Sequence, residues 1–223
     1  MTALRSDLEP LPPKLRSLSI DERGYPVPWF VDWIDGKPEF RAMDRRKFRD
    51  AIKKKLCWVC GDPLGVNLAF LAGPMCGINR TSAEPPNHYA CAAWSARNCP
   101  FLNNPRAVRR EDELINNAAF TDDDQPGNAI CRNPGVAMVW VCRGYEIWKP
   151  PGGGVLITMG EPDRVEWYRE GRPATRAEVL QSIETGLPAL EVVAESEPGA
   201  MADLRRKEQR LAKWLPEMQV VKQ

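Results

Sequence analysis

Four metal-ligating side chains stand in two closely spaced pairs, and any fold of this chain has to bring the two pairs together. The first pair is Cys57-x2-Cys60, followed by Gly61, and the second is His88-x2-Cys91, after 27 intervening residues. A Cys-x2-Cys pair that turns at a glycine lets two thiolates reach one ion, and an i, i+3 pair in the first turn of a helix places an imidazole and a thiolate on one face. The spacing therefore predicts a structural Cys3His zinc site.

Two further cysteines leave alternatives for this ligand set. Cys76 lies between the two pairs and Cys99 follows the second pair. Either residue can replace His88 as the fourth ligand, or join an iron–sulfur cluster with the cysteines of the two pairs. Buried free cysteine is common and neither residue stands in a paired motif, so the pattern favours His88. Cys131 and Cys142 are interpreted as core or loop thiols.

Composition limits both the size of the fold and the class of protein. With 223 residues, of which 43% are hydrophobic, the chain suffices for one substantial domain or two small ones. The net charge of +1 excludes a protein whose whole surface coats nucleic acid, so such binding would need a local patch. Because the chain lacks a long apolar stretch and an apolar signal core, we expect a cytoplasmic protein without membrane contact. Thiols stay reduced in that compartment, which favours metal over disulfides.

The segments before the first cysteine pair have distinct local signals. Residues 1–24 are interspersed with prolines and charges, which predicts an extended N-terminal arm that adds little to the core. Apolar residues alternate along residues 25–40, on both sides of Asp35-Gly36, a dipeptide typical of a type I′ turn. This pattern predicts a β-hairpin. Asp44 is a suitable N-cap for a helix over residues 45–56, in which apolar residues recur every four positions.

Between the two pairs, the apolar runs 66–71 and 75–78 are separated by Gly73-Pro74, which predicts a hairpin. Asn87 can cap a helix that starts near His88 and stops before Pro100. The order is knuckle, hairpin, helix. Over residues 56–100 this order and its ligand pairs resemble the treble-clef zinc fingers. That resemblance implies a small metal-stabilised module and leaves the function open, because treble clefs serve in many kinds of protein.

The second half reads as strands followed by helices. Residues 103–133 are interpreted as an irregular connection with a short helix over 110–117, and residues 134–223 as an antiparallel sheet with two C-terminal helices. The expected strands form a meander and cover residues 136–142, 145–148, 155–159 and 165–168. Thr175-x-x-Glu178 is a capping box for a helix that should end at Gly186, and a last amphipathic helix covers 198–215. Residues 25–102 then hold the hairpin, the basic helix and the zinc module. The expected fold class is α+β, with these segments either forming separate domains or packing as one unit.

Catalysis is not expected from this sequence. Acid–base chemistry near neutral pH most often uses histidine, and His88 is the only one. Treble-clef nucleases need a catalytic histidine on their hairpin, where this chain has Asn67 and Asn79. Residues 122–124 are consecutive aspartates of the kind that are usually solvated, and the glycines before residue 155 lack the lysine of a phosphate loop. A metal-dependent hydrolase is therefore the third hypothesis for the function.

A local excess of positive charge favours a binding protein. Basic side chains crowd the helix before Cys57 and follow the second ligand pair, with Trp58, Tyr89 and Trp94 as expected stacking surfaces. The alternative is a solvated helix face balanced by Asp44 and Asp50. We predict a non-enzymatic protein that contacts nucleic acid or a nucleoprotein complex, and the candidate contacts are Arg45, Arg46, Lys53, Lys54, Lys55 and Arg97. The rival hypothesis is a protein-binding accessory or inhibitor factor that uses Trp29, Trp33 and the C-terminal helix.

A further resemblance rests on longer runs that begin at Cys57, Ala72, Ser82, Cys99 and Asn133. These runs are similar to those of a group of uncharacterised bacterial and bacteriophage proteins. The resemblance implies a phage or mobile-element setting, and it transfers no catalytic residue to this chain.

Overall fold

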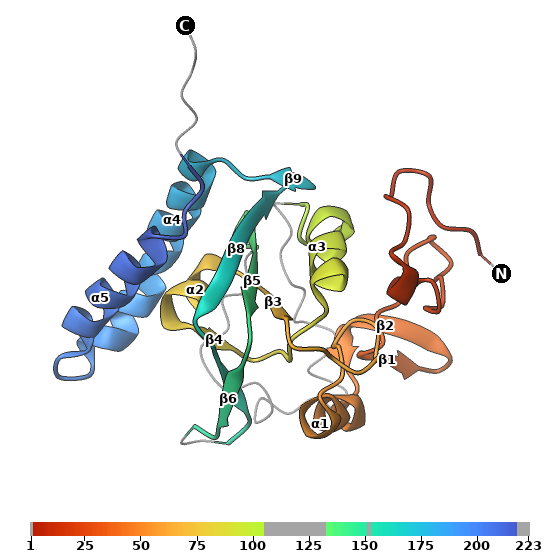
Figure 1. The fold of residues 1–223 in the computed structure, drawn as a ribbon, viewed down its shortest axis with the longest axis horizontal. Coiled ribbons are helices and arrows are strands. Elements are labelled where there is room, and N and C mark those ends of the chain that lie inside the picture. The colour runs from red at the N-terminus through yellow and green to blue at the C-terminus, as the bar shows by residue number, and fades with distance from the viewer. Residues whose placement is uncertain (1, 105–132, 151–152, 218–223) are drawn as a thin grey trace, which may run out of the picture.

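A four-stranded antiparallel sheet in the order β3-β5-β8-β9 forms the centre of the computed structural model, which describes residues 2–104, 133–150 and 153–217 (Figure 1). Its strands are β3 (Leu68–Ala72), β5 (Ala137–Cys142), β8 (Pro162–Arg169) and β9 (Arg172–Pro173). Five α-helices accompany antiparallel sheets in the described residues, so the mixed α and β composition predicted from the sequence is confirmed. The short helix expected over 110–117 lies outside them.

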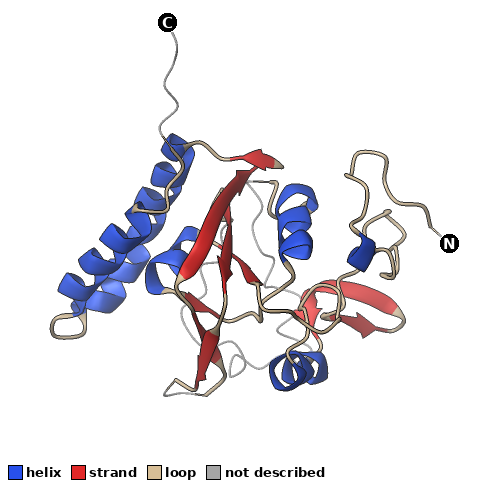
Figure 2. Ribbon diagram, viewed as in Figure 1, coloured by secondary structure: helices blue, strands red, loops and turns tan. Residues whose placement is uncertain are grey.

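Strand β5 is buried on both faces and so carries two layers of core. Met138 and Trp140 face the cluster that includes residues of α2, α4 and α5, whereas Val139 and Val141 pack against α3. Figure 2 shows the same arrangement, with the long helices on one side of the sheet and α3 on the other. Because both faces of β5 are covered, the strand has no polar residue at any position.

The expected meander is wrong in its pairing, although all four expected strands exist. Strand β5 pairs with β3 and β8, while β6 (Tyr145–Trp148) and β7 (Leu156–Met159) form a separate three-stranded sheet with β4 (Thr81–Ser82). The two sheets meet where the amide of Gly160 donates to the carbonyl of Gly144 over 2.9 Å. A Cβ on Gly160 would lie 2.4 Å from that oxygen, so the close approach of the two backbones needs glycine there.

The predicted N-terminal hairpin and the helix after it are confirmed. Strands β1 (Val31–Ile34) and β2 (Lys37–Met43) pair antiparallel around Asp35 and Gly36, whose φ angles are 50° and 76°. Helix α1 (Arg45–Lys54) follows, and the Asp44 carboxylate accepts from the backbone amides at its start. Helix α1 lies at the edge of the molecule (Figure 1), and its Ile52 packs against the core cluster that includes residues of the central sheet.

The hairpin expected between the two ligand pairs is wrong, because residues 75–78 lie in helix α2 (Pro74–Asn79). Proline suits the first position of a helix, where its missing amide is not needed. Strand β3 instead pairs with β5, which is distant in the sequence and gives it a longer apolar partner. In the part of the chain that is described, the ligand pairs are therefore joined by β3, α2 and β4, and not by the hairpin of a treble clef.

Two long helices close one side of the sheet. Helix α4 (Arg176–Glu195) begins with the predicted capping box, and α5 (Ala200–Ala212) is the predicted last helix. The expectation that α4 ends at Gly186 is wrong. A Cβ on Gly186 would lie 3.1 Å from the Met75 side chain, so this glycine serves the contact between α2 and α4 and not a helix end. Among the described helices, none combines the length and apolarity that crossing a membrane requires.

The N-terminal arm is part of the core, contrary to the sequence prediction. Apart from the 3-10 helix η1 (Pro13–Leu15) the arm has little regular structure, yet Leu15 is fully buried. It packs in one cluster with Cys57, Cys91 and Trp94. Leu8, Leu11 and Leu18 pack around the same cluster. The sequence signal for this contact is the leucine spacing at 8, 11, 15 and 18, which the interspersed prolines obscured.

Candidate metal centre

The four predicted ligands meet in space. The sulfur atoms of Cys57, Cys60 and Cys91 and a ring nitrogen of His88 all lie within 4.8 Å of one another. The three cysteines are buried and the histidine is partly buried, so the cluster is enclosed. One ion with metal–sulfur bonds of about 2.3 Å can bridge atoms at this spacing. The cluster can therefore hold a metal ion.

The other described cysteines lie outside this cluster. Cys76 lies in α2, Cys99 follows α3 (Tyr89–Asn98), and Cys142 ends β5. Burial raises the pKa of each of these thiols. Since the ligand cluster in the described residues contains neither Cys76 nor Cys99, replacement of His88 by either residue has no support in the geometry. Cys131 lies outside the described residues.

The first ligand pair sits in a tight backbone turn. The Gly61 amide donates to the Cys57 carbonyl over 2.8 Å, and the Cys57 amide donates to the Asp62 carbonyl over 2.8 Å. Gly61 has a φ of 79°, and a Cβ there would lie 2.7 Å from the Trp29 ring. The Cys57 sulfur faces two backbone amides, those of Cys60 at 3.5 Å and His88 at 3.4 Å. Such amide contacts stabilise a thiolate.

The His88 ring is oriented for coordination through Nδ1. Its Nδ1 lies 3.3 Å from the Cys60 sulfur and 3.9 Å from the Cys91 sulfur. Its Nε2 lies 3.0 Å from the Pro63 carbonyl. A carbonyl only accepts hydrogen bonds, so the ring proton belongs on Nε2 and the lone pair of Nδ1 faces the sulfurs. A ligating histidine usually has this kind of outer partner, which fixes its tautomer.

Asn87 has a role that the sequence analysis missed. It was expected to cap α3, but the N-cap residue is His88, in an extended conformation. The Asn87 side chain instead accepts from the Val59 amide over 3.1 Å and donates to the Ala69 carbonyl over 3.3 Å. Its backbone also exchanges two hydrogen bonds with Ala69, at 2.7 and 2.9 Å. Asn87 therefore joins the Cys57 turn to β3 and positions the next residue, His88.

The three thiols oppose one another's ionisation. Hydrogen bonds from the thiols of Cys60 and Cys91 lower the pKa of Cys57. The resulting Cys57 thiolate raises the pKa of both Cys60 and Cys91. Only a nearby cation allows three adjacent sulfurs to be thiolates together. A divalent ion in the centre removes this conflict, so its binding must displace protons.

The N-terminal arm supplies a positive charge beside the centre. Lys14 forms an ion pair with Asp62 at 3.0 Å. The pKa of Lys14 is raised, mainly by the hydrogen bond to Asp62. The arm is thus tied to the residue that follows the cysteine turn.

The predicted basic residues fall into two groups. Arg45, Arg46, Lys53, Lys54 and Lys55 are exposed on or directly after α1. Arg97 lies apart from them on α3, where its Nε is 2.9 Å from the Glu9 carboxylate and its guanidinium lies 5.8 Å from the Tyr168 ring centre. Arg97 is therefore already paired within the fold.

The expected aromatic stacking surfaces are mostly internal. Trp58 is buried, with its ring stacked on Phe30 at 4.8 Å. Trp94 is buried and donates from Nε1 to the Glu9 carbonyl over 3.2 Å. Tyr89 is partly buried, and the Arg164 guanidinium lies 4.1 Å from its ring centre. The prediction of stacking surfaces at Trp58 and Trp94 is wrong, because both rings are needed to fill the core around the centre.

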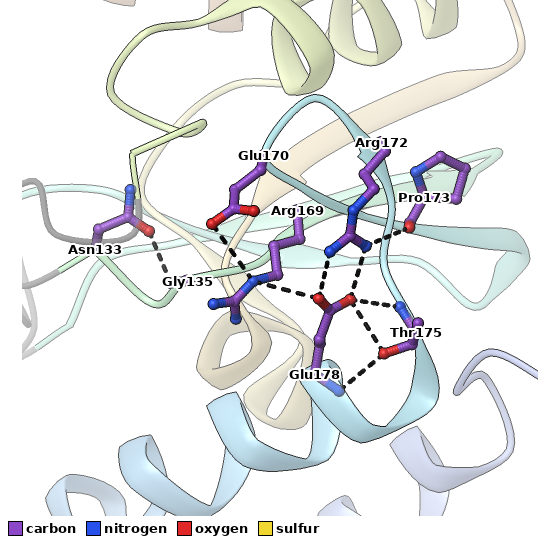
Figure 3. A network of polar contacts seen from close by, with 8 residues as sticks. All are labelled: Asn133, Gly135, Arg169, Glu170, Arg172, Pro173, Thr175 and Glu178. Carbon is purple, nitrogen blue, oxygen red and sulfur yellow. Dashed lines mark hydrogen bonds and ion pairs between the residues drawn. The ribbon is translucent and has the colours of Figure 1, made fainter.

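A second charged cluster, at the start of α4, is structural (Figure 3). The Glu178 carboxylate accepts from both Nη atoms of Arg172, at 3.0 and 2.6 Å, and from the Thr175 amide at 2.8 Å. Arg169 lies 3.4 Å from the same carboxylate. The hydrogen bonds from Arg172 lower the pKa of Glu178 to about 2. Since every partner belongs to the capping box or to the turn beside it, this cluster holds the helix start in place.

Comparison of the chain with protein-family models, curated proteins and solved structures found no match. The resemblances to treble-clef fingers and to bacterial and bacteriophage proteins stay predictions.

Proposed function

We propose that the centre holds a structural Zn²⁺ ion. The ion would be bound by the sulfurs of Cys57, Cys60 and Cys91 and by Nδ1 of His88. Three thiolates and one imidazole are a donor set that suits zinc, and four protein ligands leave no position for water or substrate. A closed site of this kind contributes to folding and supplies no catalytic water, so the proposal assigns the protein no catalytic role.

We further propose that the protein binds nucleic acid, and the observation that carries this is the charge distribution on α1. Residues 45–55 contain seven basic side chains and one acidic side chain. The first turn of α1 has no acidic residue, so within the cap and first turn Asp44 supplies the one carboxylate at the positive end of the helix dipole, beside Arg45, Arg46 and Lys47. Arg45, Arg49 and Lys53 repeat every four residues, where like charges destabilise a helix by about 0.2 to 0.5 kcal/mol per pair. An anionic partner would offset both the unfavourable interaction with the helix dipole and the repulsion between like charges.

The test is binding of labelled nucleic acids to zinc-loaded protein, measured by fluorescence anisotropy over a salt series. Replacing Arg45, Arg46, Lys53, Lys54 and Lys55 together by glutamine should weaken binding and flatten its salt dependence, by about one unit of log–log slope per lost phosphate contact. Exposed charges contribute little to folding, so thermal stability should stay nearly constant.

A matched comparison separates local from general charge effects. The triple variant Arg49→Gln, Lys53→Gln and Lys55→Gln changes the net charge as much as Arg206→Gln, Arg210→Gln and Lys213→Gln on and after α5. Only the α1 triple should weaken binding. Absence of affinity for any DNA or RNA at low salt would reject the proposal.

The second candidate is a protein-binding accessory factor, favoured by the surface of the C-terminal helices. A groove of about 310 Å³ between α4 and α5 is lined mainly by apolar side chains, and Leu180, Val192 and Val193 are exposed on α4. Capture of a protein partner that survives nuclease treatment, with binding that depends little on salt, would favour this candidate.

A further inference from the structure

Several cations on or directly after α1 are exposed. The side chains of Arg49, Lys53 and Lys55 are exposed and make no hydrogen bond or ion pair with another residue of the described ranges. Arg46 pairs with the N-cap carboxylate of Asp44 and Lys54 pairs with Asp50, and the side chains of these two cations remain 83% and 57% exposed. Five cations can therefore turn toward a ligand without breaking a contact in the core.

The surroundings of this face favour phosphate contacts over base stacking. Binding of single strands depends on aromatic side chains that stack with bases, each worth about 1 to 3 kcal/mol. Two aromatic residues that the sequence placed near the cations, Trp58 and Trp94, are 2% and 5% exposed. Trp33, on the β1–β2 hairpin, is 46% exposed and offers the main test of the opposite view.

We propose that α1 lies in the major groove of a B-form DNA duplex and that its cations contact the phosphates on the groove walls. This inference rests on the proposed nucleic-acid binding. A helix is about 10 to 12 Å across and the B-DNA major groove is about 12 Å wide, whereas the major groove of A-form RNA is too narrow to admit side chains. Helix α1 lies at the edge of the molecule (Figure 1), and its cations Arg45, Arg46, Arg49, Lys53 and Lys54 are exposed.

Charge density adds to this preference for a duplex. Double-stranded DNA carries one charge per about 1.7 Å of its axis, twice the density of one strand. The cations from Arg45 to Lys53 span about 12 Å along α1, at 1.5 Å per residue. A rigid row of this length meets more phosphates on a duplex than on a flexible single strand.

The experiment compares three labelled probes of one mixed sequence: the DNA duplex, one of its strands and the corresponding RNA duplex. We expect the DNA duplex to bind at least roughly tenfold more tightly than either other probe, because it alone combines the groove width and the charge density. Arg49→Gln and Lys53→Gln should each reduce the log–log salt slope on the DNA duplex by about 0.9. Arg206→Gln on α5 should leave the slope unchanged.

Three outcomes overturn the inference while the proposed function stands: a single strand or an RNA duplex that binds as tightly as the DNA duplex, salt slopes that Arg49→Gln and Lys53→Gln leave unchanged, or affinity that Trp33→Ala abolishes. The first removes the duplex preference, the second moves the contact away from α1, and the third replaces phosphate contact by stacking. Lack of binding to all three probes rejects the inference and the proposed function together.

Discussion

The substitution Leu15→Ala tests whether the N-terminal arm packs into the core or only lies on the surface. Leu15 is fully buried against Cys57, Cys91 and Trp94, although it lies in a proline-rich segment with little regular structure. Polar contacts hold the same segment in place. The Glu9 amide donates to Asn98 over 2.8 Å, and the Glu9 carboxylate pairs with Arg97 at 2.9 Å. These contacts tie the arm to α3, next to the cluster in which Leu15 is buried.

The expected cost follows from the buried carbon atoms. The substitution removes three buried carbon groups at roughly 0.8 kcal/mol each, or about 2.4 kcal/mol of transfer free energy. The cavity left behind adds to this, and Leu→Ala changes in well-packed cores cost about 2 to 5 kcal/mol. If the segment detaches instead of leaving a cavity, the cost is limited to the free energy that held it. Detachment then exposes the peptide bonds after Lys14 and Arg16 to trypsin.

Chemical denaturation of the zinc-loaded protein gives the free energy of unfolding, and limited trypsin digestion gives the accessibility of the arm. Leu4→Ala is the control, because Leu4 is only partly buried and belongs to none of the core clusters around the centre. Leu15→Ala should lower the unfolding free energy by at least about 2 kcal/mol, or accelerate cleavage, while Leu4→Ala does neither. A loss below about 1 kcal/mol with unchanged cleavage would refute the packing argument.

Three further outcomes are expected. Cys91→Ser should abolish stoichiometric zinc and destabilise the fold, whereas Cys131→Ser should retain the metal; elemental analysis that finds iron, or full zinc in Cys91→Ser, contradicts the ligand assignment. Asn87→Ala should lower zinc affinity by about 10- to 100-fold in chelator competition, because it removes the side-chain hydrogen bonds that join the Cys57 turn to β3, and Asn67→Ala should leave affinity unchanged. The pKa of Glu178 is lowered from 4.5 to about 2, so its contribution to stability is present above pH 4.5 and is lost as the pH falls toward 2. The stability difference between the wild type and Glu178→Gln should therefore shrink over that range, and a constant difference would show that the ionised carboxylate contributes nothing.

The sequence alone determined the features that depend on residues a few positions apart. The two ligand pairs, the turn at Asp35-Gly36, the Asp44 cap and the Thr175 capping box each need only local backbone geometry. The spacing within each pair already directed two donor atoms to one point, and a shared ion explains why the pairs should meet. The ligand set was therefore predicted before any tertiary contact was known.

Only the tertiary structure decided which apolar surfaces meet. Strand β3 took β5 as its partner instead of the neighbouring segment, which became α2, and Gly186 served a helix contact where a helix end was expected. The same holds for Leu15 and Asn87, since their neighbours in space are distant in the chain. Short-range propensity differs little between a short helix and a short strand, whereas burial against a remote partner is worth several times more. The periodicity of a sequence reports on short-range propensity and not on burial against a remote partner.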